Sequence, residues 1–574
     1  MLKNIVFENY RCFENNSVLF KNLSVLVGKN NAGKSTITEA LRMIAYAARK
    51  STKTTYRAIP TSMGIGIGKK GIRIDVDSLK IDLRSAIYLY EDKIAHVVAL
   101  FDNEARIELY VSTEEAYAIL YAPNGKMINL KTKAEAYCFN HQIAILPQIG
   151  LIKEKERLFE SSTTENYKET YLSSRHFRNE IFRSKELYWR KFKKMAEASW
   201  ENLRIVSLDY NYESLDKDTP ILLMLEVDKF MAEIGLVGSG LQMWLQIIWF
   251  LCRSQNCETI ILDEPDVYMH PDLQLKLLEI LKSLDVQVII ATHSVEIISA
   301  VSPANIMVVN KKKRNMKYVN SLDAAQRLIE NIGSVQNLSL IRLGQKKKCL
   351  FVEGHDITLL SRIYQSVFPD KENIFLDMPY VELKGFCNLS EAFGTSKLLY
   401  GETENSIKSY CLLDRDYYSE ETLENRKDMA SNNHLSLHIW NRKEIENYLI
   451  NLDILLELTK GKIQKDVLYK AIDKIVDSYE STVKEQIFEH KKQANAKLAL
   501  STIFAYTDQF MSEHWTSLDD KLYICPGKKV LADIMRWFQE ELGISISTSK
   551  IINRFTVENI DEELLEVFER LETL

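Results

Sequence analysis

The stretch from Gly28 to Ser35 constrains the fold of this chain more than any other, because it fits the pattern G-x-x-x-x-G-K-[ST]. It follows an apolar, β-prone run at 23–27 and precedes a helix-like segment at 35–48, whose apolar stripe comprises Ile37, Ala40, Leu41 and Ile44. A strand, a glycine-rich turn and a helix in this order bring backbone N–H groups to the positive end of the helix, where phosphate binds. We therefore expect an α/β fold that carries a nucleotide site.

The residue types in this turn predict how ATP is held. Lys34 is expected to contact the β- and γ-phosphates, and the Ser35 hydroxyl is expected to bind Mg²⁺. The neighbouring backbone is expected to surround the phosphates, and the predicted lining residues are Asn30, Asn31, Ala32, Gly33 and Thr36.

Two apolar strands far along the chain predict the other half of this site. The first, from Thr259, ends in Asp263 and Glu264, and a buried strand that ends in two acids can place a magnesium ligand beside a water-activating base. We assign Asp263 to magnesium and Glu264 to the attacking water. The second strand, at 286–290, is followed by Thr292-His293-Ser294, so His293 is expected to lie near the γ-phosphate.

A turn at Gly238-Ser239-Gly240 opens an apolar helix shortly before the first of these strands. The glycine-rich turn, this Ser-Gly turn, Leu-Asp-Glu-Pro and Thr-His-Ser, in that order, resemble the ABC-type ATPase head of the SMC and RecF class. The resemblance implies that Ser239 of one subunit contacts the γ-phosphate held by another. A homodimer or a higher homo-oligomer would follow.

The same resemblance implies two further nucleotide contacts. Gln148, which follows an apolar run, would sense magnesium, and Arg11, in the opening Asn9-Tyr10-Arg11-Cys12-Phe13, would approach the nucleotide. The charged segment at about 150–200 lacks long heptad repeats. We interpret it as a helical insertion that offers a dimer contact.

The second half of the chain contains another set of acidic strand ends. One apolar strand ends at Glu353-Gly354, and a later one, at 410–413, ends in Asp414-Arg415-Asp416. Residues two apart on a strand face the same way, so both aspartates are expected to reach one metal ion. Carboxylate oxygens are hard ligands that select Mg²⁺ or Mn²⁺, and such ions activate water against a phosphodiester.

Strand-Glu-Gly followed by strand-Asp-x-Asp resembles the Toprim domain of topoisomerases, primases and nucleases. Its fusion to an ABC-type head resembles the overcoming-lysogenisation-defect (OLD) family of ATP-dependent nucleases, which includes the Gabija nuclease subunit and retron-associated effectors. The resemblance implies an ATP-regulated, Mg²⁺- or Mn²⁺-dependent endonuclease that acts on DNA in anti-phage defence. It also implies as partners a helicase, or a retron reverse transcriptase with its non-coding nucleic acid.

This resemblance carries roles onto particular residues. Glu353, Asp414 and Asp416 would bind metal and act in catalysis, and Glu444 and Glu446 match the third acidic motif, with the choice between them open. Lys528, after Gly527, is the candidate for the lysine near the scissile phosphate, with a tight turn of solvated lysines as the alternative. One position departs from the family, because Ile357 stands where a second acid is usual and Asp356 comes one residue earlier. Whether one or two metal ions bind therefore stays open.

Length and composition set the domain plan. A chain of 574 residues is too long for a single core. We expect an α/β protein with an ABC-type ATPase domain at 1–344, a Toprim metal-binding nuclease domain at 345–450 and a mostly helical part at 451–574. A net charge of −5 argues against a uniformly basic DNA coat. The sequence contains no long apolar run or signal segment, which predicts a cytoplasmic protein without a membrane partner.

Three functions fit these residues. The first is a DNA endonuclease gated by ATP, and the second is an RNA-cleaving toxin of the kind that attacks tRNA, because nothing in the sequence reads a 2′-hydroxyl. The third is a RecF-like DNA-binding ATPase sensor that does not cut. The substrate sequence, the trigger and the direction of control by ATP stay open.

Overall fold

The computed structural model describes residues 1–52, 54–66, 68–91, 93–128, 139, 141–147, 149–161, 164, 173–211, 219–267, 269–331, 338–354, 356–383, 388–403, 406–494 and 498–573. The chain divides into two compact units, Met1–Gln336 (unit 1) and Asn337–Leu574 (unit 2). The helix α11 (Leu338–Lys346) opens unit 2 and contains the position at which the sequence predicted the end of the ATPase domain.

Unit 1 is built on three sheets. A seven-stranded sheet has the order β2-β1-β6-β7-β8-β5-β4, a six-stranded sheet the order β16-β15-β3-β14-β13-β9, and a small one the order β10-β11-β12. The strands are β1 (Leu2–Tyr10), β2 (Phe13–Leu19), β3 (Leu23–Val27), β4 (Arg57–Ala58), β5 (Lys70–Arg73), β6 (Ala95–Phe101), β7 (Arg106–Val111), β8 (Ala116–Tyr121), β9 (Ile143–Ile145), β10 (Leu203–Asp209), β11 (Leu222–Val227), β12 (Phe230–Glu233), β13 (Thr259–Asp263), β14 (Gln287–Ala291), β15 (Ile306–Val308) and β16 (Lys317–Tyr318).

The six-stranded sheet carries the predicted nucleotide strands. β3 pairs in parallel with β14, and β14 pairs in parallel with β13, so the ends of these three strands meet at one edge. Their residues are buried almost throughout, as expected for parallel strands covered on both faces. The helix α1 (Lys34–Lys50) contacts both β7 and β9, and its apolar stripe joins the core shared with the seven-stranded sheet.

Unit 1 contains seven further helices among its described residues. They are α2 (Val76–Leu79), α5 (Phe177–Arg183), α6 (Lys185–Ser199), α7 (Ser239–Arg253), α8 (Pro271–Lys282), α9 (Val295–Ser299) and α10 (Leu322–Asn331), with 3-10 turns at Thr61–Met63, Leu83–Ser85, Tyr88–Tyr90, Ser173–His176, Ile234–Leu236 and Pro303–Asn305. In its described part, the predicted insertion is helical from Ser173 to Ser199. α6 contacts α7 and buries Phe192 against Trp249, so the insertion belongs to the core of unit 1.

Unit 2 contains a four-stranded parallel sheet in the order β18-β17-β19-β20. Its strands are β17 (Lys348–Glu353), β18 (Tyr380–Leu383), β19 (Lys408–Leu413) and β20 (Leu435–Ile439), and the connecting helices are α12 (Asp356–Val367) with α13 (Ile374–Asp377), α14 (Leu389–Glu402) and α15 (Glu420–Asn432). β17 and β19 lie side by side in the middle of the sheet. The chain passes from β17 to β18 on one side and from β19 to β20 on the other side, so these two connections run in opposite directions across the sheet. Ligands of open parallel sheets bind at such a switch point, beyond the carboxyl ends of the strands.

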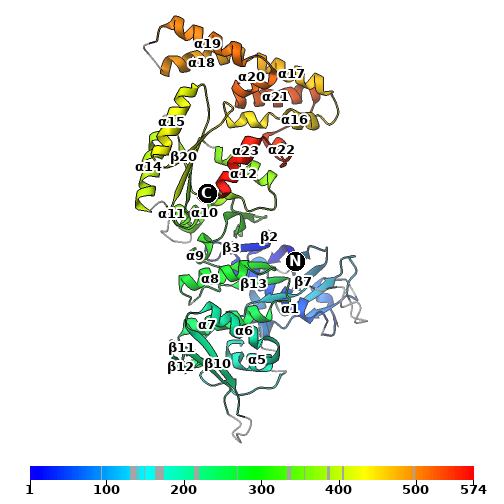
Figure 1. Cartoon of the computed structure of the whole chain (residues 1–574). Helices are drawn as coiled ribbons and strands as arrows, with labels where there is room; N and C mark the ends of the chain where they lie inside the picture. Colours follow the sequence, from blue (N-terminus) through cyan, green and yellow to red (C-terminus); the bar gives the residue numbers. More distant parts are fainter. Residues whose placement is uncertain are drawn as a thin grey trace. The chain divides into compact units, whose positions relative to one another are not determined.

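The two faces of this sheet are covered by different helices. Phe351 and Cys411 pack with residues of α14 and α15, which run along one flank of unit 2 in Figure 1. Leu350 and Leu412 pack with α12 and with the C-terminal helices. After a 3-10 turn at Ile445–Leu449, the C-terminal helices are α16 (Leu452–Leu458), α17 (Lys465–Asp477), α18 (Glu480–Ala494), α19 (Leu500–His514), α20 (Leu518–Ile524), α21 (Gly527–Leu542), α22 (Thr548–Ile552) and α23 (Glu562–Thr573). Among them, α18 and α19 pack in a separate small cluster around Tyr417. Across the described ranges, none of these helices combines the length and apolar character needed to cross a bilayer.

Candidate functional site

Unit 1 contains a cavity of about 310 Å³ that brings together residues from both ends of its sequence. Its lining comprises Arg11, Cys12, Asn30, Asn31, Ala32, Gly33, Lys34, Ser35, Thr36, Glu264 and His293. The glycine-rich turn thus lies beside the residues that follow β13 and β14, because those strands are neighbours of β3 in one parallel sheet. We call this space the phosphate cavity.

Lys34 is fixed at the centre of the phosphate cavity. Its Nζ donates to the Gly28 carbonyl at 3.0 Å and lies 2.6 Å from His293 Nε2. Burial lowers the pKa of Lys34, although the carboxylates of Glu264 and Asp263 oppose that shift. Burial, followed by the charge of Lys34, also lowers the pKa of His293. A lower pKa favours a neutral ring, whose Nε2 can accept a hydrogen bond from the Lys34 ammonium.

The backbone of the turn can adopt its conformation only because of its residue types. Gly33 has φ of 112°, and a Cβ there would lie 2.5 Å from the Phe13 ring. Asn31 also has a positive φ, 67°, a conformation that asparagine tolerates better than most residues. The turn therefore needs glycine at its last position before the helix.

The two acids at the end of β13, Asp263 within the strand and Glu264 after it, have different surroundings. Glu264 has φ of 48°, an uncommon conformation for a non-glycine residue, and its side chain lines the phosphate cavity. Asp263 lies outside that lining and accepts from Arg42 Nη2 at 2.7 Å. The carboxylate predicted to bind magnesium is therefore ion-paired with α1, whereas the predicted base is exposed to the cavity.

Arg11 lies at the edge of the phosphate cavity, in a strained turn with φ of 50°. Its guanidinium donates to Glu39 at 2.6 Å and to the Ser85 hydroxyl at 2.8 Å. The side chain is thus held by protein groups at the place where the sequence predicted a nucleotide contact. Gln148, the predicted magnesium sensor, lies outside the described residues.

Ser239 is exposed at the first turn of α7 and is not part of the phosphate cavity lining. The loop before it is firmly held. Gln242 donates to the Val237 carbonyl at 2.9 Å and accepts from the Ile152 N–H at 2.8 Å. Glu233 accepts from the Gly235 N–H at 2.7 Å and pairs with the fully buried Arg178 of the insertion at 2.6 Å.

Unit 2 contains a second polar cavity, of about 790 Å³, beyond the carboxyl ends of β17 and β19. All five predicted acids contribute to its lining, as does Lys528. The acids are Glu353, Asp414, Asp416, Glu444 and Glu446, and Asp356 joins them from the first turn of α12. We call this space the acidic cavity.

Asp356 takes the place of the acid that the sequence lacked at Ile357. Ile357 is 6% exposed and packs in the core of unit 2, whereas Asp356, one residue earlier, faces the acidic cavity. A helix rotates by about 100° per residue, so this shift of one position exchanges a core side chain for a cavity side chain.

Asp414 and Asp416 converge for a different reason from the predicted one. β19 ends at Leu413, so neither aspartate is part of the strand and the alternation of a strand does not apply. Asp416 instead has φ of 45°, and its N–H donates to the Lys443 carbonyl at 3.3 Å. A tight left-handed turn directs both side chains into the acidic cavity.

Crowding of carboxylates raises several pKa values in the acidic cavity. Burial, followed by Asp356, Glu353, Asp416 and Glu444, raises the pKa of Asp414 to about 9. Burial and then Glu446 and Glu353 raise the pKa of Asp356 to about 7. The pKa values of Glu353 and Glu446 are also raised, chiefly by burial. A cation in the cavity would relieve this repulsion.

Glu444, Glu446 and Lys528 are not equivalent in their contacts. Glu444 accepts from the Lys443 ammonium through Oε1 and from the Lys528 N–H through Oε2, at 3.1 Å in the latter case. Lys528 belongs to the first turn of helix α21, and not to a tight loop turn between elements. Gly527 gives the backbone a close approach to Asn447, since a Cβ there would lie 2.3 Å from Asn447 Oδ1.

The acidic cavity fits a divalent metal ion in its chemistry. Asp414 Oδ1 is buried and has no hydrogen-bond partner among the residues that the structure describes, and hard carboxylate oxygens crowd around it. Within the described ranges, however, no group of three or more His, Cys, Asp or Glu side chains already stands in an arrangement that could hold an ion. The side chains would have to move together for a metal to be bound.

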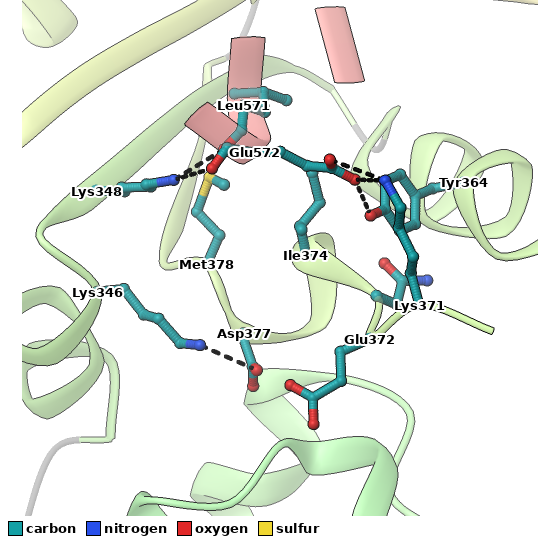
Figure 2. Close-up of a pocket in the computed structure, with 11 residues that line it drawn as sticks. Lys346, Lys348, Tyr364, Lys371, Glu372, Ile374, Asp377, Met378, Leu571 and Glu572 are labelled. Atoms are coloured by element: carbon teal, nitrogen blue, oxygen red, sulfur yellow. Dashed lines mark hydrogen bonds and ion pairs between the residues drawn. The ribbon is translucent and has the colours of Figure 1, made fainter. Parts of the chain in front are cut away.

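Another cavity of about 420 Å³ lies at the opposite end of β17 (Figure 2). Lys348 Nζ donates to the Leu571 carbonyl at 3.0 Å and the Glu572 carbonyl at 3.1 Å, which fixes the last turn of α23. Lys371 pairs with Glu572 at 2.9 Å, and Lys346 pairs with Asp377 at 3.4 Å. Lys348 and Lys371 thus hold the C-terminal helix α23, whereas Lys346 holds α13.

Sequence reasoning did not nominate Asp356 or the buried Lys443 as site residues. Asp356 was noted only as a departure from a family spacing, and a helical periodicity aligned on Ile357 as a core residue would have identified it. Lys443 directly precedes Glu444 in the sequence, but a single lysine beside an acid carries no signal of burial. Its contact with Asp416 depends on folding.

Comparison with known proteins supports the assignment of unit 1. Residues 23–299 match the family described as "AAA domain, putative AbiEii toxin, Type IV TA system", and the phosphate cavity lies within this range apart from Arg11 and Cys12, as fits an ATPase domain. No curated protein that was compared with the chain matches it.

Several solved SMC heads are similar to the chain at 14% identity. One, bound to the C-winged helix domain of ScpA, covers 55% of this chain and 97% of its own with a TM-score of 0.36. A head with an extended coiled coil, bound to the C-terminal domain of ScpA derived from Pyrococcus furiosus, covers 58% and 99% with a TM-score of 0.35. The head from Thermotoga maritima covers 56% and 99% with a TM-score of 0.29. Because these TM-scores are low, the assignment of unit 1 as an ATPase domain rests on the family match and on the phosphate cavity.

Proposed function

We propose that this protein is an ATP-regulated, divalent-metal-dependent endonuclease that acts on DNA, and that unit 2 is a Toprim-like nuclease module. The observation that carries the proposal is the meeting of Glu353, Asp414 and Asp416 at the switch point of a parallel sheet. The buried, unpartnered Asp414 Oδ1 supports a cation there. A role in anti-phage defence, with a helicase or a retron reverse transcriptase as partner, rests on the OLD-family resemblance alone.

The chemistry of the acidic cavity supports hydrolysis of a phosphodiester. A divalent ion held by the carboxylates would neutralise the phosphate and lower the pKa of an attacking water. Glu353, Asp414 and Asp416, together with Asp356 and Glu446 of the same cavity lining, are the residues that would hold it. Lys528 and Arg362 line the same cavity and supply positive charge for the phosphate backbone.

In unit 1, we propose that Lys34 binds the β- and γ-phosphates of ATP with Mg²⁺ on Ser35 and Asp263. Release of Asp263 from Arg42 would accompany metal binding, because the two now form an ion pair. Glu264 would activate the attacking water, since its carboxylate lines the phosphate cavity opposite Lys34. His293 would follow the γ-phosphate through its contact with Lys34 Nζ.

The two activities should separate in variants. Asp414→Ala and Asp416→Ala each remove a carboxylate from the acidic cavity and leave the phosphate cavity intact. We expect loss of plasmid cleavage in Mg²⁺ or Mn²⁺ with unchanged phosphate release from ATP. Lys34→Ala should lose ATP binding, because its ammonium is the cation at the centre of the phosphate cavity.

The control is Asp428→Ala, an acid on α15 outside the acidic cavity lining, which should keep both activities. Full cleavage by an Asp414→Ala, Asp416→Ala double variant would place the nuclease centre elsewhere. Supercoiled DNA and tRNA are offered in parallel. Cleavage of tRNA alone would favour the RNA-cutting toxin, and no cleavage of either would favour the ATPase sensor.

A further inference from the structure

Lys443 places an ammonium group behind the acidic side chains of unit 2. The residue is 7% exposed, and its Nζ donates to Glu444 and lies 3.6 Å from Asp416 Oδ1. The ring of Tyr417 lies near the same ammonium, with its centroid 5.3 Å from Nζ. A lysine is rarely buried to this degree unless it is paired, and here both of its acidic partners line the acidic cavity.

The backbone keeps Lys443 in this position. Its N–H donates to the Tyr523 carbonyl at 2.8 Å, and its carbonyl accepts from Asp416 N–H at 3.3 Å. The preceding residue, Arg442, pairs with Asp561 at 3.0 Å. Lys443 is thus tied to the turn that carries Asp416 and to the end of α20, so the ammonium belongs to the architecture of the cluster.

The contacts of Lys443 also determine which carboxylates have an oxygen free to bind a metal ion. One oxygen of Glu444 is taken by Lys443 and the other by the Lys528 N–H. Asp414 Oδ1, in contrast, is buried without a partner among the described residues, and Asp356 and Glu446 also line the cavity. A carboxylate whose two oxygens are both engaged is a poorer metal ligand than one with a free oxygen.

We infer that Lys443 is the resident counter-cation of the acidic cavity, so that the cluster binds one divalent ion and not two. Two-metal sites hold their carboxylates together with a second divalent ion. Here the ammonium neutralises Glu444 and one side of Asp416, and the single ion lies among Glu353, Asp356, Asp414 and Glu446. Lys443 acts through these acids and is therefore a positioning residue. The inference rests on the proposed function, because it requires the acidic cavity to bind metal.

The test counts Mn²⁺ ions bound to the full chain without nucleotide, by electron paramagnetic resonance of the free ion. The wild type is expected to bind one ion per chain in the acidic cavity. Lys443→Met removes the ammonium at similar length, so Glu444 and Asp416 regain free oxygens, and a second ion is expected. Lys443→Arg keeps the charge and should still bind one. Asp263→Asn removes the proposed magnesium ligand of unit 1, so a lower ion count in this variant would report an ion bound there.

Glu444→Gln and Glu446→Gln form a matched pair that does not depend on the folding of Lys443→Met. We expect Glu444→Gln to keep the ion and Glu446→Gln to weaken its binding by about tenfold or more, as loss of one charged ligand should. Two ions in the wild type, an unchanged count and affinity in folded Lys443→Met, or equal losses in the two glutamate variants would overturn the inference. Absence of any bound Mn²⁺ from the acidic cavity of the wild type would instead overturn the proposed function.

Discussion

Asp414 and Asp356 keep protons in the folded chain at pH values where isolated aspartates have lost them. Burial and neighbouring carboxylates raise their pKa values from 3.8 to about 9 and about 7. The folded state therefore binds these protons more tightly than the unfolded state does. Their contribution to the free energy of unfolding is full below the unfolded value of 3.8 and is lost as the pH rises through about 7 and about 9.

We predict that the metal-free protein loses thermal stability between pH 6 and pH 9, and that Mn²⁺ restores it at the upper end. The ion offsets the charge of the deprotonated carboxylates, and it binds better as they lose protons. Asp414→Asn removes the higher of the two transitions and should flatten the decline. The measurement is the midpoint of thermal unfolding across this pH range, with and without Mn²⁺. Parallel declines in the wild type and Asp414→Asn would contradict the prediction.

At the level of elements, the approach of α21 to the acidic cavity depends on one glycine. A Cβ at Gly527 would lie 2.3 Å from Asn447 Oδ1 and 2.7 Å from Asn447 N. Asn447 cannot withdraw easily, because it is completely buried and its Nδ2 donates to the Leu522 and Cys525 carbonyls. The start of α21, with the Lys528 N–H on Glu444, is therefore fixed by this contact.

Gly527→Ala should destabilise the protein by about 1–3 kcal/mol, the usual cost of overpacking a filled core. Gly394→Ala is the matched control, since Gly394 lies inside α14 with open space around its Cβ position. That change should stabilise by about 0.5–1 kcal/mol, because alanine favours a helix over glycine. Urea unfolding of both variants measures the difference. A Gly527→Ala protein as stable as the wild type would show that α21 can shift away from Asn447.

The elements that could be predicted from the sequence are those with continuous apolar runs. β3, β13 and β14 fall where the runs around 23–27, 259–263 and 286–290 indicated, since parallel strands are buried on both faces. β17 and β19 follow the same rule, and the helix expected at 35–48 corresponds to α1. The acids at the carboxyl ends of β13, β17 and β19 therefore lie at the sheet edges where the sequence predicted them.

The seven-stranded sheet of unit 1 could not be predicted from apolar runs. It joins β1 to β6, and a strand's own pattern does not identify a partner so far along the chain. The same limit applies to Lys443, whose contact with Asp416 forms only once the turn after β19 meets the segment after β20. The left-handed turns at Glu264 and Asp416 also could not be predicted from the sequence, because acidic residues only occasionally adopt that conformation.

At the scale of the whole molecule, the exposed Ser239 and the phosphate cavity are the two halves of a proposed ATP sandwich between chains. Glu264→Gln should bind ATP but hydrolyse it at least about 100-fold more slowly, as expected when a positioned base is lost. We predict that this variant forms an ATP-dependent dimer or higher oligomer in size-exclusion chromatography with light scattering. Ser239→Arg, on an exposed position, should keep the fold and abolish that assembly. An unchanged mass of Glu264→Gln at saturating ATP would remove the sandwich from the proposal.

The buried guanidinium of Arg178 has a consequence for how this chain can vary. It joins the insertion to Glu233 at 2.6 Å, and Glu233 in turn holds Gly235 in the loop that leads to Ser239. Gln246 of α7 also donates to the Gly150 carbonyl at 2.8 Å. Grafting another protein's insertion between β9 and β10 would leave the largely buried Glu233 without its cationic partner, a costly state. A substitution that removes this cation from the insertion therefore has to be matched by a substitution at Glu233, or the loop that leads to Ser239 loses its support.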